Sequence, residues 1–94
     1  MRTIERSSTF KRDYKHTKAN PQHRSDLDAL VMKILAALVA DQTLPASNRD
    51  HALSGQWTGN RECHIKPDLL LVYRKLDHNI LRLVRLGSHS ELFS

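Results

Sequence analysis

Residues 61–86 read RECHIKPDLLLVYRKLDHNILRLVRL and decide the fold. Residues 61–66 alternate as in a strand with two different faces. One face carries Cys63 and Ile65, and the other carries Glu62, His64 and Lys66. This stretch begins a β-rich second half of the chain.

The rest of this stretch predicts two more strands. Residues 69–76 form a nearly continuous apolar run, which indicates a central strand that is buried on both faces in its first half. Pro67 and Asp68 form one turn, residues 77–79 form the next, and residues 80–86 form the third strand before Gly87 breaks it. Two tight connections in succession predict an antiparallel three-stranded meander.

Two helices are expected before the meander. The second has the clearer pattern, an apolar stripe made of Leu27, Leu30, Val31, Ile34, Leu35, Leu38 and Val39. We expect this helix to begin at Pro21, which suits a first helical position, and to end in residues 41–45. The stripe is expected to pack on the sheet, and a coiled-coil seam for a partner is the alternative.

The first helix follows a short N-terminal stretch. Residues 2–5 predict an edge strand, Ser7 or Ser8 offers an N-cap hydroxyl, and Asn20 ends the helix. Residues 41–60 are rich in turn-forming residues and predict a long loop. The expected fold is therefore α+β: a single domain over residues 1–94 with an N-terminal strand, a two-helix hairpin, a long loop and the meander, forming one sheet packed on the helices.

Composition excludes several classes of protein. The chain has 94 residues, 39% of them hydrophobic, and a mean hydropathy of −0.53, which argues against both a membrane protein and a disordered chain. Its single cysteine, Cys63, cannot form an internal disulfide. The N-terminus has no uninterrupted apolar run of the kind found in a secretory signal, so a cytoplasmic protein is expected.

Positive charge is concentrated at the N-terminal end. The formal net charge is +5, and residues 2–24 alone carry seven basic and two acidic side chains, while the remainder balances. Lys11, Lys15 and Lys18 follow one stripe of the first helix. Such a basic segment is typical of contact with nucleic acid, and a merely solvated basic face is the alternative.

The second half of the chain is rich in histidine. His64 and Asp68 flank the first turn of the meander and are expected to approach each other, His89 follows the last strand, and His51 lies in the long loop. His78 lies in the opposite turn and is set aside. Because Cys63 and His64 face opposite sides of one strand, and the histidine spacing fits no compact zinc signature, no metal or other cofactor is expected.

Imidazoles beside a carboxylate and arginines suit RNA cleavage without a metal. That reaction needs a base for the 2′-hydroxyl, an acid for the departing 5′-oxygen, and cationic donors for the phosphorane. Histidine titrates near neutrality and is able to fill either proton-transfer role.

Two segments resemble a known family. Residues 50–73 read DHALSGQWTGNRECHIKPDLLLVY and residues 85–93 read RLGSHSELF. They are similar to the YafQ branch of the RelE/ParE toxin superfamily, whose members carry D-H-x-L-x-G-x-W-x-G-x-R-x-x-H-x-x-P-D-x-x-L-x-Y, then R-x-G-x-H and a terminal L-F. The order of the expected elements is also the family's, so the resemblance covers the whole chain.

The resemblance implies a function. It implies the toxin of a bacterial type II toxin–antitoxin pair, an endoribonuclease that enters the ribosomal A site, cuts translated mRNA without a metal, and is neutralised by a cognate antitoxin. It assigns the catalytic group to His51, His64, Asp68 and His89, with His89 as the favoured general acid and the base open among the other three.

The resemblance also implies substrate contacts. Phe93 is expected near a base and Arg85 at a phosphate, while Arg61 is expected either at a phosphate or paired with a carboxylate. Ribosomal RNA contacts are expected from Lys11, Arg12, Lys15 and Lys18. Trp57 is expected to pack against the protein, and the chain has Leu69 where the best-known members have a Trp that contacts mRNA.

Two other functions fit parts of the pattern. One is a non-catalytic ParE-like toxin that poisons DNA gyrase, although such relatives lack the histidine and aspartate constellation. The other is a simple nucleic-acid-binding module that uses only its basic helix.

Overall fold

Five strands form one sheet in the computed structural model, which describes residues 1–93. The strands are β1 (Thr3–Arg6), β2 (His51–Ala52), β3 (Arg61–Lys66), β4 (Leu69–Leu76) and β5 (Ile80–Gly87). Their order is β1-β5-β4-β3-β2, with β1 parallel to β5 and all other neighbours antiparallel. The predicted α+β class, edge strand and meander are confirmed, and β2 is a short strand that the sequence pattern does not predict.

The turns of the meander form for the expected reasons. Pro67 and Asp68 separate β3 from β4, and Asp77 has a positive φ of 52°, a left-handed conformation that Asp tolerates better than most residues. The first five residues of β4 are all buried, as predicted for a central strand. The meander is therefore fixed by local turn chemistry together with burial of β4.

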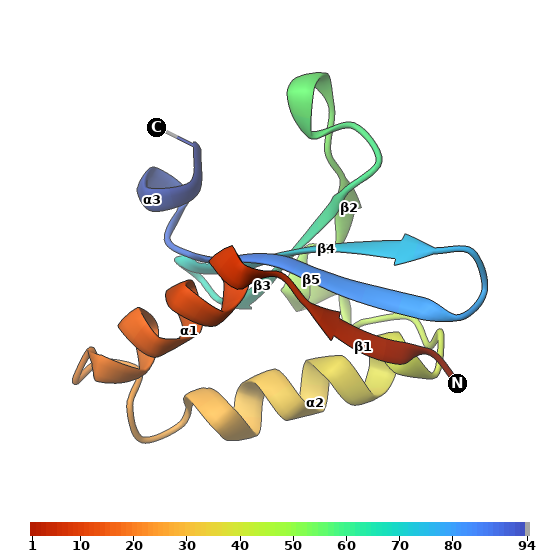
Figure 1. Ribbon diagram of the computed structural model, residues 1–94. Helices are drawn as coiled ribbons and strands as arrows, with labels where there is room; N and C mark the ends of the chain where they lie inside the picture. Colours follow the sequence, from red (N-terminus) through yellow and green to blue (C-terminus); the bar gives the residue numbers. More distant parts are fainter. Residues whose placement is uncertain (94) are drawn as a thin grey trace.

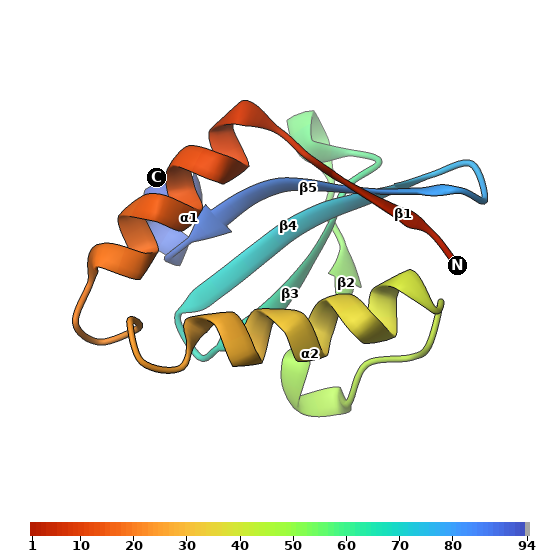
Figure 2. The ribbon, with the colours of Figure 1, turned by 60° about the horizontal axis from the view of Figure 1, so that its bottom comes forward.

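Two helices, α1 (Ser8–Ala19) and α2 (Leu27–Val39), cover one face of the sheet, below it in Figure 1 and in front of it in Figure 2. α1 starts where expected because the Ser7 hydroxyl accepts the backbone N–H of Phe10 at 2.9 Å. The apolar stripe of α2 packs on the sheet. The main core consists of Phe10, Leu27, Val31, Ile34, Leu35, Leu38, Leu44, Cys63, Ile65, Leu69, Leu71, Tyr73, Leu81, Leu83 and Leu86.

α2 begins at Leu27, so the expected start at Pro21 is wrong. The side-chain oxygen of Asn20 accepts the backbone N–H of Gln22 at 2.9 Å, and the Asn20 carbonyl accepts that of His23 at 3.0 Å. These bonds form a turn directly after α1, in which proline's fixed φ is also favourable. The turn delays the second helix.

Within the described residues, the opposite face carries only short elements. These are the helix α3 (His89–Phe93) and the single 3₁₀ turn η2 (Gly55–Trp57), while η1 (Ala46–Asn48) contacts β3. Figure 1 shows α3 at the left and the arm that carries η2 at the right, both above the sheet on this face. A second apolar cluster lies between them, made of Leu53, Trp57, Leu70, Val72, Val84, Leu92 and Phe93.

A bulge near the end of β3 changes one predicted orientation. The pairing with β4 shifts register between His64 and Lys66, which inserts one extra residue and reverses the alternation. The Lys66 ammonium lies 2.8 Å from the carboxylate of Asp26, beside the connection between α1 and α2. The prediction that Lys66 shares a face with Glu62 is therefore wrong.

Among the described residues, no helix combines the length and the apolar character that crossing a lipid bilayer requires.

Candidate active site

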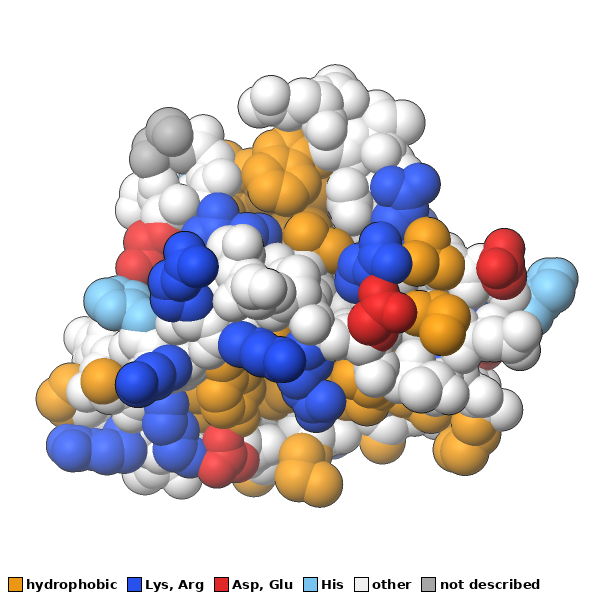
Figure 3. Space-filling model, in the orientation of Figure 1, with side chains coloured by type: hydrophobic (Ala, Val, Ile, Leu, Met, Phe, Trp, Pro, Cys, Tyr) orange, Lys and Arg blue, Asp and Glu red, His pale blue; other side chains and the backbone are white. Residues whose placement is uncertain are grey.

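The candidate active site lies on the face of the sheet that α1 and α2 leave uncovered. Figure 3 shows this face hollowed between two raised parts, with hydrophobic side chains on the floor of the hollow. In the strand register His64 on β3 is opposite Leu70 on β4, and Leu70 is opposite Gly87 on β5, two residues before His89. Sheet pairing thus brings distant parts of the sequence to one place.

His51 lies on β2 directly opposite Glu62 on β3. Its Nε2 is 3.1 Å from a carboxylate oxygen of Glu62, and its Nδ1 is 2.7 Å from the carbonyl oxygen of Arg49. The His51 side chain is 51% exposed, whereas that of Glu62 is only 7% exposed. A nearly buried carboxylate therefore holds an imidazole that is open to solvent.

Glu62 is a site residue that the sequence reasoning did not select. Its signal was available, because Glu62 is two positions before His64 on one strand and so points to the same face. Its partner was not available, because β2 is too short to be recognised from sequence. The pairing of β2 with β3 is what makes Glu62 part of the site.

The hydrogen bonds of His64 and Asp68 differ from the expected pairing across the turn. Nδ1 of His64 lies 3.1 Å from the carbonyl oxygen of Pro67. The carboxylate of Asp68 instead accepts the backbone N–H of His89 at 3.1 Å. Asp68 therefore ties the β3–β4 turn to the start of α3.

A capping box reinforces the start of α3. The Ser88 N–H donates to the Glu91 carboxylate at 2.8 Å, and the Glu91 N–H donates to the Ser88 hydroxyl at 3.2 Å. The bond from the Ser88 backbone is the main cause that lowers the pKa of Glu91. The spacing Ser-x-x-Glu is readable from sequence, so this helix start had a recognisable signal.

The His89 ring lies against an aromatic pair. Its centroid is 5.4 Å from that of Phe93, and Phe93 in turn makes an edge-to-face contact with Trp57, also at 5.4 Å. The prediction that Trp57 packs against the protein is confirmed.

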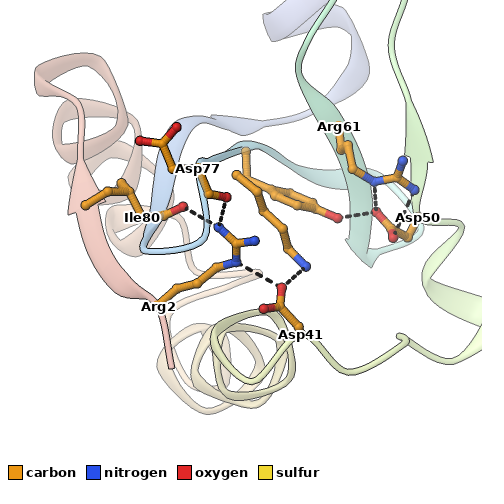
Figure 4. Close-up of polar contacts among 8 residues, drawn as sticks. Arg2, Asp41, Asp50, Arg61, Asp77 and Ile80 are labelled. Carbon is orange, nitrogen blue, oxygen red and sulfur yellow. Dashed lines mark hydrogen bonds and ion pairs between the residues drawn. The ribbon is translucent and has the colours of Figure 1, made fainter.

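Arg61 and Arg85 are both paired with carboxylates. Arg61 contacts Asp50 through Nη2 at 3.2 Å, and Figure 4 shows this pair at the edge of the sheet. Arg85 contacts Asp13 on α1 through Nε at 2.7 Å and Nη2 at 3.1 Å, which raises the pKa of Arg85. Of the two expectations for Arg61, the carboxylate pair is the one present.

The predicted basic surface divides into free and paired side chains. Lys18 is bound to Asp28, the residue that also accepts the hydroxyl of Tyr14. Lys11, Arg12 and Lys15 are exposed and form no ion pair with the residues that the structure describes. Figure 3 shows Lys and Arg side chains gathered over α1.

Cys63 and Leu69 point away from the site. Both lie in the main core, on the side of the helices. Burial raises the pKa of the Cys63 thiol to about 12, which makes it a poor nucleophile and metal ligand. Within residues 1–93 no group of three or more His, Cys, Asp or Glu side chains is arranged to hold a metal ion.

A polar pocket of about 490 Å³ opens on the α1 side of Asp68. Its walls come from the end of α1, the β3–β4 turn and the start of α3. They include His16, Gln22, Lys66, Leu69, Ser88 and Glu91. Leu69 is thus an apolar part of this wall.

Comparisons with known proteins identify the family of this chain. Residues 2–94 match the family described as "Bacterial toxin of type II toxin-antitoxin system, YafQ". The mRNA interferase toxin YafQ of Escherichia coli K12 is 39% identical over 95 residues, which cover 99% of this chain and 97% of that protein.

Solved structures are similar over the whole chain. The metal-bound toxin from Helicobacter pylori has a TM-score of 0.87 and 49% identity, and covers 99% of this chain and 100% of its own. YafQ in the E. coli DinJ–YafQ complex has a TM-score of 0.83 and 34% identity, with full coverage of both chains. The chain therefore belongs to the YafQ family of toxins from bacterial type II toxin–antitoxin systems.

Proposed function

We propose that this toxin is an mRNA interferase, an endoribonuclease that cuts mRNA in the ribosomal A site and so stops translation in the cytoplasm. The observation that carries the proposal is the convergence of His51, His64 and His89 from β2, β3 and α3 on one open face. The family and the activity in the name of the E. coli relative support it.

The proposed reaction needs only proton transfers and charge stabilisation. A base removes the proton of the 2′-hydroxyl, and the 2′-oxygen attacks the adjacent phosphorus. The bond from phosphorus to the 5′-oxygen breaks as an acid protonates that oxygen. The products are a 2′,3′-cyclic phosphate and a 5′-hydroxyl end.

His64 is the proposed general base. A carbonyl oxygen only accepts hydrogen bonds, so the contact with Pro67 places the proton of the neutral ring on Nδ1. Nε2 of His64 then carries the free lone pair. This nitrogen is the one available to take the proton of the 2′-hydroxyl.

His51 is a less suitable base in this geometry. Both of its ring nitrogens face oxygen atoms, Nδ1 the Arg49 carbonyl and Nε2 the Glu62 carboxylate. Neither ring nitrogen is therefore free to take the proton of the 2′-hydroxyl in this geometry. We assign His51 to the phosphate, where its Nε2 exchanges the contact with Glu62 for one with a phosphate oxygen as negative charge develops there.

His89 is the proposed general acid. Its backbone is fixed by Asp68 and its ring by Phe93, so the imidazole is pre-oriented at the edge of the hollow. In this account Asp68 positions α3 and leaves proton transfer to the histidines.

Two macromolecular partners follow from the proposal. The exposed Lys11, Arg12 and Lys15 are suited to phosphates of ribosomal RNA, a contact that weakens as salt increases. The E. coli relative has been solved in complex with DinJ. By analogy this chain binds a cognate antitoxin, whose acidic side chains would neutralise the same basic surface.

The test uses ribosomes programmed with one mRNA and purified toxin. His89→Ala should slow cleavage by about 10² to 10⁴, with new 5′-hydroxyl ends mapping in the reading frame. His78→Ala is the matched control, because His78 lies in the turn at the other end of the sheet and should leave the rate unchanged. Full activity of His89→Ala would contradict the assignment, and equal cleavage of naked RNA would contradict ribosome dependence.

A further inference from the structure

A buried tyrosine connects the main core to the strand that carries His51. Tyr73 on β4 is 1% exposed, and its ring belongs to the main core. Its hydroxyl donates to the carboxylate of Asp50, the residue immediately before His51. Arg61 donates to the same carboxylate through Nη2 at 3.2 Å and makes a longer contact through Nε at 3.4 Å (Figure 4).

The strand that holds His51 is short and lies at the edge of the sheet, with Leu53 after it packed in the second apolar cluster. β2 has only two residues, both exposed, and pairs with β3 on one side alone. Arg49 just before it has a positive φ of 49°, which is unfavourable for a residue with a side chain. A short edge strand entered through such a residue needs an anchor, and the Asp50 carboxylate supplies one.

The Arg49 conformation matters because its carbonyl contacts the His51 ring. That carbonyl fixes Nδ1, while Glu62 fixes Nε2. Asp50 lies between Arg49 and His51 in the chain. Displacement of Asp50 would therefore move the ring and the carbonyl that orients it.

We propose that Asp50 and Tyr73 are positioning residues for His51, and that they act by anchoring β2 to the core. This inference rests on the proposed function, in which His51 acts at the phosphate. Burial raises the pKa of the Tyr73 hydroxyl, so it remains a donor at any pH at which the protein works. The phenol ring fills the core, and the hydroxyl is the part that serves the site.

The test removes the hydroxyl and keeps the ring. Tyr73→Phe should lower the saturating rate of ribosome-bound mRNA cleavage about 10- to 100-fold, because a displacement near 1 Å at a reacting group costs about that much. The toxin concentration for half-maximal rate should not change. Tyr14→Phe is the matched control, since Tyr14 likewise donates to a carboxylate, that of Asp28, on the helix side.

A double-mutant cycle separates positioning from general stability. In a His51→Ala background, Tyr73→Phe should cause less than about a twofold further loss, because the group that it positions is already absent. Asp50→Ala should match Tyr73→Phe, and Asp50→Asn should recover part of the rate because its amide oxygen still accepts the hydroxyl. Equal losses with and without His51 would overturn the proposal, as would an unchanged rate in Tyr73→Phe or in His51→Ala.

A spectroscopic arm distinguishes failure of this inference from failure of the proposed function. The ¹⁵N chemical shifts of the His51 ring report which nitrogen is protonated and hydrogen-bonded. They should change in Tyr73→Phe and stay constant in Tyr14→Phe, whether or not the wild-type toxin cleaves RNA. Unchanged shifts in Tyr73→Phe would overturn the inference, whereas inactive wild-type toxin with the expected shifts would count against the function alone.

Discussion

The two faces of the sheet differ in what their side chains do. The face under α1 and α2 is lined by apolar side chains that form the main core. The open face has a small apolar floor with polar contacts around it: the Glu62 carboxylate contacts the His51 ring, and the Asp68 carboxylate accepts the backbone N–H of His89. The comparison teaches that one face of the strands contributes most of the stability and the other carries the proposed catalytic groups. Single substitutions should therefore change stability and activity separately.

The largest expected effect is a loss of activity without a loss of stability, from a substitution on the open face. His64→Ala should lower the rate of mRNA cleavage by about 10² to 10⁴, equivalent to about 3 to 5 kcal/mol of activation free energy. The free energy of unfolding should change little, because the imidazole is half-buried at the surface and its Nδ1 contact is local to the turn. Single-turnover kinetics and urea unfolding measure the two quantities on one sample.

The opposite outcome is equally informative about His64. An active His64→Ala would leave His51 or Asp68 as the base and contradict the tautomer argument. A strongly destabilised His64→Ala would show that the open face contributes to folding, and would break the comparison between the two faces.

Two adjacent leucines offer the next test. Leu71 points into the main core and Leu70 into the cluster on the open face, and both are essentially fully buried. Either change to Ala should lower the free energy of unfolding by about 2 to 5 kcal/mol. Only Leu70→Ala should also slow cleavage under conditions where both variants remain folded, because Leu70 is paired with His64 and Gly87.

Two results would contradict the prediction for the two leucines. Equal rates for the two folded variants would mean that the floor of the hollow does not help to place the histidines. A slower Leu71→Ala with an unaffected Leu70→Ala would reverse the assignment of the faces.

The elements that could be predicted from the sequence are those long enough to show a regular repeat of apolar residues. The stripe of α2 and the alternation of β3 repeat often enough to be recognised, and Pro67 with Asp68 marks a turn by its own chemistry. β2 and α3 have two and five residues, so no periodicity can reveal them. β2 forms by pairing with β3, which is a tertiary contact. α3 combines the local Ser88–Glu91 capping box with a tertiary bond from the His89 backbone to Asp68.

The candidate site could be read from the sequence to the same extent. The histidines could be chosen because imidazoles suit the chemistry and because the family motif includes them. Their partners could not, since the contact of His51 with Glu62 requires the register of an unrecognised strand. The bulge that redirects Lys66 is likewise a property of two paired strands, which one strand's sequence does not specify.

The smallest expected effect concerns the carboxylate of Asp41, which joins the end of α2 to β1 and β4 at the end of the sheet away from the candidate site. Asp41 contacts Lys75 at 2.7 Å and Arg2 at 2.9 Å, and these two contacts lower its pKa to about 2 (Figure 4). Asp41 is 51% exposed, whereas Asp50 at the site is 25% exposed. Solvent screens the Asp41 pairs, so Asp41→Asn should reduce stability only slightly at neutral pH and leave cleavage unchanged.

The pH dependence of Asp41→Asn follows from the direction of that shift. A carboxyl whose pKa is lower in the folded state contributes stability above its unfolded value, near 3.8, and loses it as pH falls toward about 2. The difference in urea midpoint between wild type and Asp41→Asn should therefore be present at pH 7 and shrink between about pH 4 and pH 2. A constant difference over that range would mean that the Asp41 contacts do not exist in solution, and slower cleavage by Asp41→Asn would mean that this end of the sheet is not separate from the site.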